Sequence, residues 1–318
     1  MTNSWSILLD NASLLALWGA LVIHWFFPIP TAVHPIHICQ RFAVLLADKV
    51  NNPNDNYKQR LFSGTLAWAL IWGSLLILLI ALYQFVWVDV LFQLTLLWIA
   101  LGWRNTAKLS QHFINAYAKE DKVRCRQLLE YPLNRNTQNL SLLGLGKAGA
   151  ETQLLSYGRL VAGVLFWYAI AGGIGAIMYR VAICLARAWS PSRHQYNIFG
   201  LPAVRILATL DIIPLRILAL LIIVGNNSKA ALQGLIKQGE HWFLPGPGWL
   251  LSATGHKLSL SLGGPAIYDN KKMVRPQIGG KITPAAFHLA QIQQMMTHRL
   301  LAWIIIESAL LFIFQGSF

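Results

Sequence analysis

Three ionisable side chains interrupt long apolar stretches of this sequence, namely Asp211, Arg216 and Glu307. A charge at the centre of a bilayer costs about 2.5–3.5 kcal/mol on insertion scales, so each is expected to have a partner or a function. Asp211 and Arg216 flank Pro214, and a kink at the proline would bring this i, i+5 pair together. We interpret the pair as a polar site inside a helix bundle or as a structural ion pair. Glu307 has no cation on its own helix and is expected to pair with Arg216, with a loop arginine, or with a neighbouring helix.

Other candidate chemical residues carry weaker signals. His24 stands alone in an apolar run and is interpreted as a packing histidine. The three cysteines are far apart and lack the spacing of zinc ligands, so no metal site is predicted with certainty. A GxGxxG match runs from Gly144 to Gly149, but it does not follow a buried strand, which dinucleotide binding requires. No P-loop, HExxH or GxSxG motif is present.

The composition indicates what kind of element must position these residues. Of 318 residues, 55% are hydrophobic and 12% charged, against about 25% charged in ordinary soluble domains. Lys and Arg outnumber Asp and Glu by 26 to 12, which gives a net charge of +14. Apolar bulk with a basic excess is typical of an integral membrane protein with cationic loops. The hydrophobicity argues against nucleic acid as the partner of this positive charge.

Apolar runs predict six membrane spans, each approaching the ~20 residues that a helix needs to cross the hydrocarbon. The run at 90–103 is short, but only a six-span count places the basic segments on one side. The predicted spans are about 12–27, 65–88, 90–103, 160–183, 204–224 and 300–314.

The Lys and Arg residues between these spans predict the orientation. Twenty of the 26 lie in segments 31–63, 104–158 and 225–299, and the loop at 184–203 holds Arg187 and Arg193. The positive-inside rule places the three basic segments in the cytoplasm and both termini in the periplasm of a bacterial inner-membrane protein.

Two cytoplasmic segments are expected to be structured. Residues 104–130 have an amphipathic helical period, and residues 239–284 are rich in Gly and Pro but carry embedded apolar side chains. The fold class expected is an all-α polytopic membrane helix bundle, with residues 1–318 forming a single integral membrane domain in the lipid bilayer.

A set of short motifs follows in order along most of the chain. They are His34-Pro35-Ile36, Arg135-Asn136-Thr137, Ala150-Glu151-Thr152, Tyr179-Arg180, Ala203-Val204-Arg205, Ile213-Pro214-Leu215-Arg216, Leu262-Gly263-Gly264-Pro265, Tyr268 and Arg275-Pro276. The ordered set resembles the CobD/CbiB membrane proteins of cobalamin biosynthesis.

The resemblance implies an amide ligation. In that family, adenosylcobyric acid is joined to an aminopropanol or its phosphate, with ATP and Mg²⁺, to give adenosylcobinamide or its phosphate. It implies a corrinoid substrate, an amino-alcohol phosphate and other membrane enzymes of late cobalamin assembly as partners. By resemblance, Glu151 and Asp211 are the candidate catalytic carboxylates. The candidate substrate-binding residues are His34, Arg135, Tyr179, Arg180, Arg205, Arg216, Gly263, Gly264, Pro265, Tyr268 and Arg275.

The sequence departs from the family at acidic positions, with Arg159 in place of an aspartate and Leu207-Ala208 in place of two. Two alternatives stay open. The run from Leu210 to Arg216 also resembles AmpE, a membrane signalling modulator without known corrinoid chemistry. A transporter using Asp211, Arg216 and Glu307 as a relay would require internal repeats, and none is visible.

Overall fold

A computed structural model describes residues 11–30, 33–133, 137–268 and 271–315. Helices dominate these residues and the strands are few and short, which confirms the all-α class. Four helices are long and apolar enough to cross a membrane: Tyr57–Tyr83, Leu142–Ala188, Leu201–Ile223 and Ala286–Ile313; Ala12–Phe26 is apolar but shorter. The chain is therefore a helical membrane protein.

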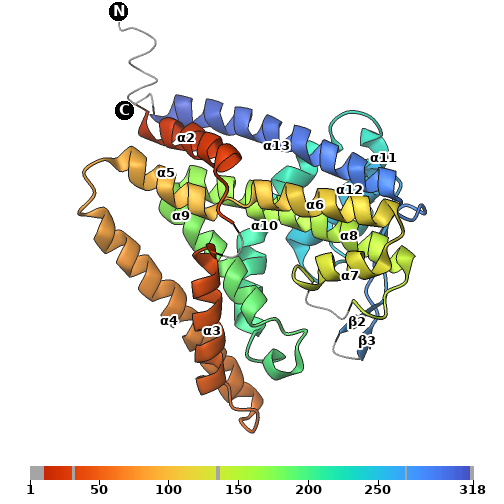
Figure 1. The fold of residues 1–318 in the computed structure, drawn as a ribbon, viewed down its shortest axis with the longest axis horizontal. Helices are drawn as coiled ribbons and strands as arrows, with labels where there is room; N and C mark the ends of the chain where they lie inside the picture. The colour runs from red at the N-terminus through yellow and green to blue at the C-terminus, as the bar shows by residue number, and fades with distance from the viewer. Residues whose placement is uncertain (1–10, 31–32, 134–136, 269–270, 316–318) are drawn as a thin grey trace, which may run out of the picture.

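The N-terminal third is a series of four helices: α2 (Ala12–Phe26), α3 (Ile36–Val50), α4 (Tyr57–Tyr83) and α5 (Asp89–Ala100). Asn11 and Asn56 cap α2 and α4, since each side chain accepts a hydrogen bond from a backbone N–H three residues on. Figure 1 shows α3 and α4 descending obliquely from a stack that contains α2, α5 and the C-terminal helix. In its most apolar window α4 is only 17% buried, as suits a helix facing lipid.

The segment predicted as one amphipathic helix forms two, α6 (Trp103–Ala118) and α7 (Lys122–Glu130). Glu120 has a positive φ of 53° between them, and Asp121 caps α7 by accepting from the N–H of Arg124. The buried face of α6 packs on the helix Leu142–Tyr157, in which Gly149 leaves room for the ring of Phe113.

The predicted span at 160–183 is a bent element. Helix α8 (Leu142–Tyr157) continues through a π-turn, η2 (Gly158–Gly163), into α9 (Val164–Ala188). Within α9, Ala171 and Gly172 leave helical geometry, and Gly172 has φ 60° and ψ −157°. The chain folds back at this point, because the rings of Trp167 and Tyr179 lie 6.4 Å apart although twelve residues separate them. We call residues 164–188 the α9 hairpin.

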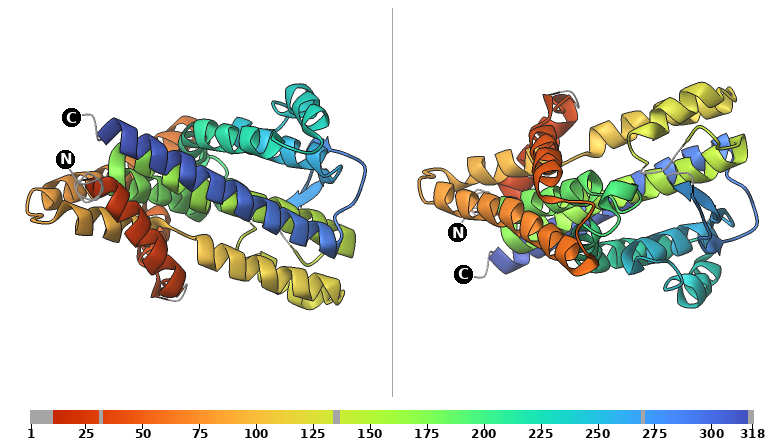
Figure 2. Two further views of the ribbon diagram at one scale, coloured as in Figure 1. Left: turned by 90° about the horizontal axis from the view of Figure 1, so that it is seen from above. Right: turned by 90° about the horizontal axis from the view of Figure 1, so that it is seen from below.

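The C-terminal half packs around α10 (Leu201–Ile223), which follows the short helix η3 (His194–Tyr196). Helices α11 (Ser228–Gln238) and α12 (Pro245–Lys257) lie against it, and α13 (Ala286–Gln315) returns along the stack (Figure 2). Between α12 and α13, β1 (Ser261–Gly263) pairs antiparallel with β4 (Gln277–Gly279), and β2 (Ala266–Tyr268) with β3 (Lys271–Met273). The prediction that residues 239–284 are ordered is confirmed for the part described.

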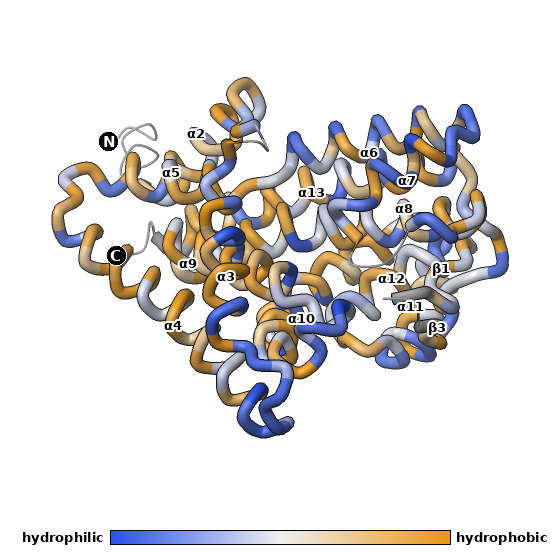
Figure 3. The backbone as a smooth tube through the Cα atoms, turned by 60° about the horizontal axis from the view of Figure 1, so that its bottom comes forward, coloured by the Kyte–Doolittle hydropathy of each residue, from blue (hydrophilic) through white to orange (hydrophobic). Residues whose placement is uncertain are grey.

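Hydropathy along the chain separates two regions of the molecule. In Figure 3 the hydrophobic segments gather over α4, α5 and α9, whereas the loop joining α3 to α4 and the far ends of α6 and α7 are hydrophilic. The ends of α2 and α13 meet, because the Asn11 side chain donates to the carbonyl of Leu311 at 3.1 Å. The polar loops therefore lie in a different part of the fold from the start of α2 and the end of α13.

Candidate functional site

Glu151 of α8 and Arg275 form a buried ion pair, which we call the Glu151 unit. The guanidinium donates to both carboxylate oxygens, at 3.1 and 3.3 Å, and the two side chains are 6% and 8% exposed. The N–H of Gly263 donates to the same carboxylate at 2.9 Å. A helix is thereby bonded to a loop more than a hundred residues further along the chain.

The Gly263-Gly264-Pro265 turn completes this unit. Both glycines have a positive φ, 73° and 89°, which residues with a Cβ rarely adopt. The carbonyl of Gly264 accepts from Arg275 at 3.0 Å, and its N–H donates to Pro276. Both amides therefore have partners within the protein in this structure, and the assignment of Gly263 and Gly264 to substrate binding stays a prediction. Pro265 is exposed, and the side chain of Tyr268 lies outside the described residues.

Asp211 is completely buried on α10, with one partner on η2 and one on the returning arm of the α9 hairpin. Arg159 donates to one carboxylate oxygen at 2.7 and 2.8 Å, and the Tyr179 hydroxyl donates to the other at 2.7 Å. We call these three residues the Asp211 unit. Arg159 replaces a family aspartate in the sequence and was not among the predicted site residues. A cation without a partner at membrane depth is the signal that could have identified it.

Arg216 has a different partner from the one predicted. Its guanidinium contacts Glu240 at 3.3 Å and lies 4.5 Å from the ring centre of Trp249. Helix α10 continues through Pro214, so residues 211 and 216 keep separate directions. Glu307 also has another partner, since it accepts from the Trp303 indole one turn earlier at 2.8 Å. The predicted pairs of Arg216 with Asp211 and with Glu307 are both wrong.

One segment, residues 240–249, touches all three of these arrangements. Glu240 and Trp249 hold Arg216, and the Trp242 ring lies 5.1 Å from the Arg275 guanidinium. At Gly246, a Cβ would stand 2.8 Å from the carbonyl oxygen of Asp211, so only glycine allows this approach. We call residues 240–249 the bridging segment, because it connects the Glu151 unit, the Asp211 unit and Arg216.

Arg180 follows Tyr179 but belongs to another environment. It has no hydrogen-bond partner among the described residues, and its Nε is buried. Its charge acts on His34, whose pKa is lowered to about 4 by burial, then by Arg180, His37 and His24. Two of the predicted site residues, His34 and Arg180, thus lie in the same part of the fold. Arg205 is exposed on α10, and Arg135 lies outside the described residues.

Comparison with known proteins decides the family. The sequence model of the CobD/CbiB protein family matches residues 17–298. The chain belongs to the CobD/CbiB family of cobalamin biosynthesis. This match favours the cobalamin interpretation over the AmpE-like one.

Individual relatives agree with the CobD/CbiB assignment. The chain is 26% identical over 292 residues to the cobalamin biosynthesis protein CobD of Stutzerimonas stutzeri, covering 92% of this chain and 96% of the relative. It is 26% identical to the protein of the same name from Chromobacterium violaceum, covering 76% and 77%. The probable CobD of Methanococcus aeolicus is 23% identical, with 78% and 84% covered. No solved structure matches.

The carboxylates of this CobD/CbiB chain do not fit a resident Mg²⁺ ion. Mg²⁺ prefers carboxylate and water oxygens in octahedral geometry, but the oxygens of Glu151 and Asp211 are bonded to guanidinium, hydroxyl or amide donors. Among the described residues no three His, Cys, Asp or Glu side chains are grouped as metal ligands.

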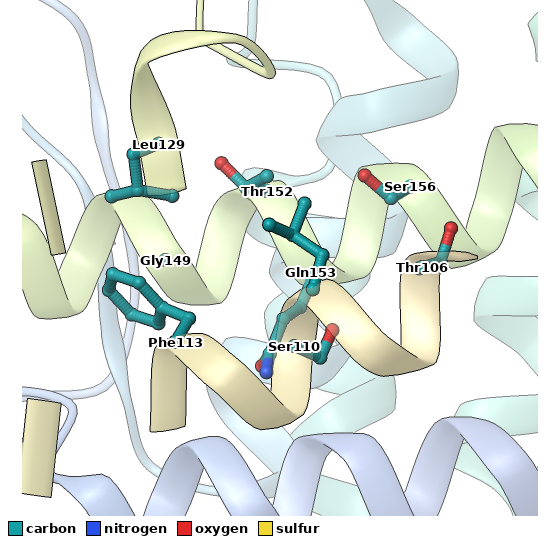
Figure 4. A pocket seen from close by; sticks show the side chains of 9 residues that line it. Thr106, Ser110, Phe113, Leu129, Gly149, Thr152, Gln153 and Ser156 are labelled. Atoms are coloured by element: carbon teal, nitrogen blue, oxygen red, sulfur yellow. The ribbon is translucent and has the colours of Figure 1, made fainter. Parts of the chain in front are cut away.

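A small uncharged pocket lies on the other face of α8. Figure 4 shows the Gln153 side chain of α8 reaching toward Ser110 of α6, and Thr152 also lines the pocket. Both amide atoms of Gln153 and the hydroxyl of Thr152 are buried without a partner among the described residues. The pocket carries no charge to match phosphate or carboxylate, so it is not the site for the anionic ends of a CobD/CbiB substrate.

Proposed function

We propose that this chain catalyses ATP-dependent amide-bond formation between adenosylcobyric acid and an aminopropanol or its phosphate, giving adenosylcobinamide or its phosphate. The proposal starts from membership of a family in cobalamin biosynthesis. Joining a carboxylate to an amine removes one carboxylate oxygen, which leaves on a phosphoryl group of ATP. ATP, the reacting carboxylate and the amino-alcohol phosphate are anionic, so the site must offer cations and backbone donors.

The observation that carries the proposal is the placement of Tyr179 and Arg180. These consecutive residues belong to two adjoining arrangements: Tyr179 bonds the neutralised Asp211 carboxylate, whereas the guanidinium of Arg180 has no acceptor among the described residues. An unpaired cation beside a rigid polar cluster suits a substrate that brings its own negative charge. A transporter relay through Asp211, Arg216 and Glu307 has less support, because these three side chains have separate partners.

Glu151 and Asp211 are assigned positioning roles within this proposal. The Glu151 carboxylate holds both Arg275 and the Gly263 amide, so it fixes the Gly263-Gly264 turn against α8. The Asp211 carboxylate orients Arg159 and Tyr179. Mg²⁺ enters the proposal with ATP as part of the substrate, and no step depends on a protein-held ion. The inner membrane, a cytoplasmic site and association with other late cobalamin enzymes remain part of the same proposal.

Membranes containing the overproduced chain test the reaction. They are incubated with adenosylcobyric acid, ATP and Mg²⁺ plus either aminopropanol or its phosphate, and products are identified by mass spectrometry. Membranes without the chain and reactions without ATP are the controls, and the Stutzerimonas stutzeri relative is run in parallel. We expect adenosylcobinamide or its phosphate only in the complete reaction. Product from the relative but not from this chain, with either amine, would reject the proposal.

A further inference from the structure

Four polar side chains lie in the region where α2 ends, α3 begins and the α9 hairpin returns. They are His24, His34, Arg180 and Arg187, and we call them the donor cluster. Arg187 is held by Tyr131, donating to its carbonyl at 3.2 Å with the ring centre 5.0 Å away. Arg180 lies one helical turn before Cys184, whose thiol donates to the carbonyl of Ile36 at 3.5 Å, so this turn of the α9 hairpin packs against the start of α3. None of the ion pairs among the described residues includes a member of this cluster.

The hydrogen bonds of the two histidines fix which nitrogen carries the proton. The Nε2 of His24 accepts from the backbone N–H of Arg104 at 3.1 Å, so a neutral ring carries its proton on Nδ1. That Nδ1 is buried and has no partner, and the whole side chain is 4% exposed. The Nδ1 of His34 accepts from the N–H of Ile36 at 3.2 Å, which places the proton on Nε2. Each imidazole therefore presents a donor.

Arg180 adds donors and no acceptor. Its Nε is buried without a partner, while the side chain as a whole is partly exposed, so the outer guanidinium nitrogens reach open space. Unpaired buried donors cost about 1–3 kcal/mol each, more when charged. Because such donors are normally satisfied, a cluster of donors without a carboxylate suits an anion with several acceptor oxygens.

We propose that the donor cluster is a binding site for a phosphate group, held by the Arg180 guanidinium with the Nδ1–H of His24 and the Nε2–H of His34. A phosphate offers oxygens in several directions and matches the guanidinium fork bidentately. Two sources share this chemistry: a soluble phosphomonoester and the headgroup of an anionic lipid. The assignment of the soluble source to an amino-alcohol phosphate rests on the proposed function, whereas the anion site does not.

Binding to purified protein, without turnover, tests the site. In detergent, titration calorimetry compares aminopropanol phosphate and inorganic phosphate with unphosphorylated aminopropanol. In nanodiscs, thermal unfolding compares phosphatidylcholine alone with phosphatidylcholine plus phosphatidylglycerol. We expect binding of the phosphorylated probes only. Stabilisation by phosphatidylglycerol, without binding of soluble phosphate, would identify the lipid headgroup as the source.

Variants assign the binding to Arg180. Arg180→Gln is expected to weaken it at least about tenfold, as loss of a charge-assisted hydrogen bond predicts. Arg180→Lys keeps the charge without the fork and is expected to give an intermediate affinity even if Arg180→Gln folds poorly. Arg41→Gln removes one exposed cation from α3 and is the matched control. No preference for phosphorylated probes or phosphatidylglycerol, or equal binding by Arg180→Gln and Arg41→Gln, would overturn the inference.

The outcomes for the site and for the reaction are separable. Phosphate binding that depends on Arg180, without any amide product from the membranes, rejects the proposed reaction and leaves the anion site standing. Amide product from a protein whose Arg180→Gln variant binds phosphate like the wild type rejects the anion site alone.

Discussion

Arg159, Arg216 and Arg275 each donate to a carboxylate, whereas Arg180 has no acceptor in the part of the chain that the structure describes. The family resemblance gives Arg180, Arg216 and Arg275 the same role, as candidate substrate-binding residues. Their surroundings separate them, because a guanidinium that already neutralises a carboxylate has less charge to offer a substrate. Residue type and motif identify which arginines matter, and only the fold shows which one is unpaired.

The ion pair of the Glu151 unit is expected to contribute both to stability and to activity, and two variants separate these contributions. Arg275→Met takes the bidentate guanidinium away from the buried Glu151 carboxylate, so we expect a loss of up to about 3–5 kcal/mol in the free energy of unfolding. The double variant Glu151→Gln/Arg275→Met removes that charge and keeps an acceptor for the Gly263 N–H, so most stability should return. Amide formation should stay at least about tenfold below wild type, because the guanidinium is missing. Thermal unfolding and the product assay measure the two effects.

The comparison between these readouts decides the role of Arg275. Recovery of both stability and product in the double variant would show that the ion pair only holds the loop to α8. Recovery of neither would mean that the packing of the two side chains matters more than their charges.

His34 predicts a pH dependence of stability. Its pKa in the fold is lowered to about 4 by burial and by the neighbouring Arg180, His37 and His24, against about 6.5 for a free imidazole. Below pH 6.5 the unfolded chain takes up a proton that the folded protein binds only near pH 4. Stability is therefore fully present above pH 6.5 and falls as the pH drops toward 4, by at most about 3 kcal/mol.

His34→Asn isolates this contribution, because its side-chain oxygen can accept from the Ile36 N–H without titrating. The melting temperature of the purified protein, measured from pH 7.5 to 4.5, should fall less in the variant than in the wild type. Parallel curves for the two proteins would contradict a neutral buried His34.

At the scale of elements, helix positions followed from the sequence better than helix contacts. Apolar runs located α2, α5 and α10 to within three residues, since burial and lipid exposure both leave a local pattern, but they missed the more polar first turns of α4 and α13, which begin at Tyr57 and Ala286. Partners distant in the chain leave none: 52 residues separate Arg159 from Asp211, and 24 separate Arg216 from Glu240. The apolar run predicts one continuous span across Gly172 and Gly173, because glycine occurs both within helices and at points where the chain reverses direction.

The turn of the α9 hairpin should depend on glycine. Gly172 has φ 60° and ψ −157°, a region open essentially to glycine, and its Cβ position faces the Gln93 side chain of α5. Gly172→Ala is expected to destabilise the protein by about 1–3 kcal/mol and to disturb Asp211, because Tyr179 lies on the returning arm. Thermal unfolding in detergent measures the loss.

Gly73→Ala is the matched control for this substitution. Gly73 lies within α4 with nothing inside 4 Å of its Cβ position, and alanine favours a helix over glycine. We therefore expect equal or higher stability for Gly73→Ala. An equal loss of stability in both variants would show that the turn at residue 172 tolerates a side chain. The loss would then be a general effect of replacing glycine in these helices.

At the scale of the whole molecule, the lysines all lie in the three basic segments, whereas arginines also occur outside them. The six cations outside the three basic segments are all arginines, namely Arg159, Arg180, Arg187, Arg193, Arg205 and Arg216. Arg159 and Arg216 form ion pairs, and Arg180 and Arg187 belong to the donor cluster. Charge counting could predict orientation from the basic segments, but it could not separate these arginines, because their roles depend on which carboxylates the fold brings near them.

The arrangement of loops predicts a membrane topology that differs from simple span counting. Six predicted spans leave the 184–203 loop opposite the basic segment 31–63. In the structure the carbonyl of Gln195 accepts from the side chains of Asn51 and Arg60, both at 2.7 Å, so the two loops adjoin. If both arms of the α9 hairpin cross the membrane, two crossings replace the single predicted one, and the 184–203 loop lies on the same side as segment 31–63. The bond of Asn11 to Leu311 keeps the start of α2 and the end of α13 on one side. Helix α10 must then begin and end on the side of the basic segments, although it is long and apolar enough to cross.

Cysteine labelling distinguishes the two topologies. Asn54→Cys, Gln84→Cys and Gln195→Cys each place a thiol at an exposed position, and labelling by a membrane-impermeant maleimide is compared with the wild-type background. We expect positions 54 and 195 to react together in inverted vesicles and position 84 to react in intact spheroplasts, because residue 84 lies at the opposite end of α4 from residue 54. Position 195 reacting with position 84 instead would restore the simple six-span count. It would also be incompatible with the bonds of Gln195 to Asn51 and Arg60, because these residues would then lie on different sides of the bilayer.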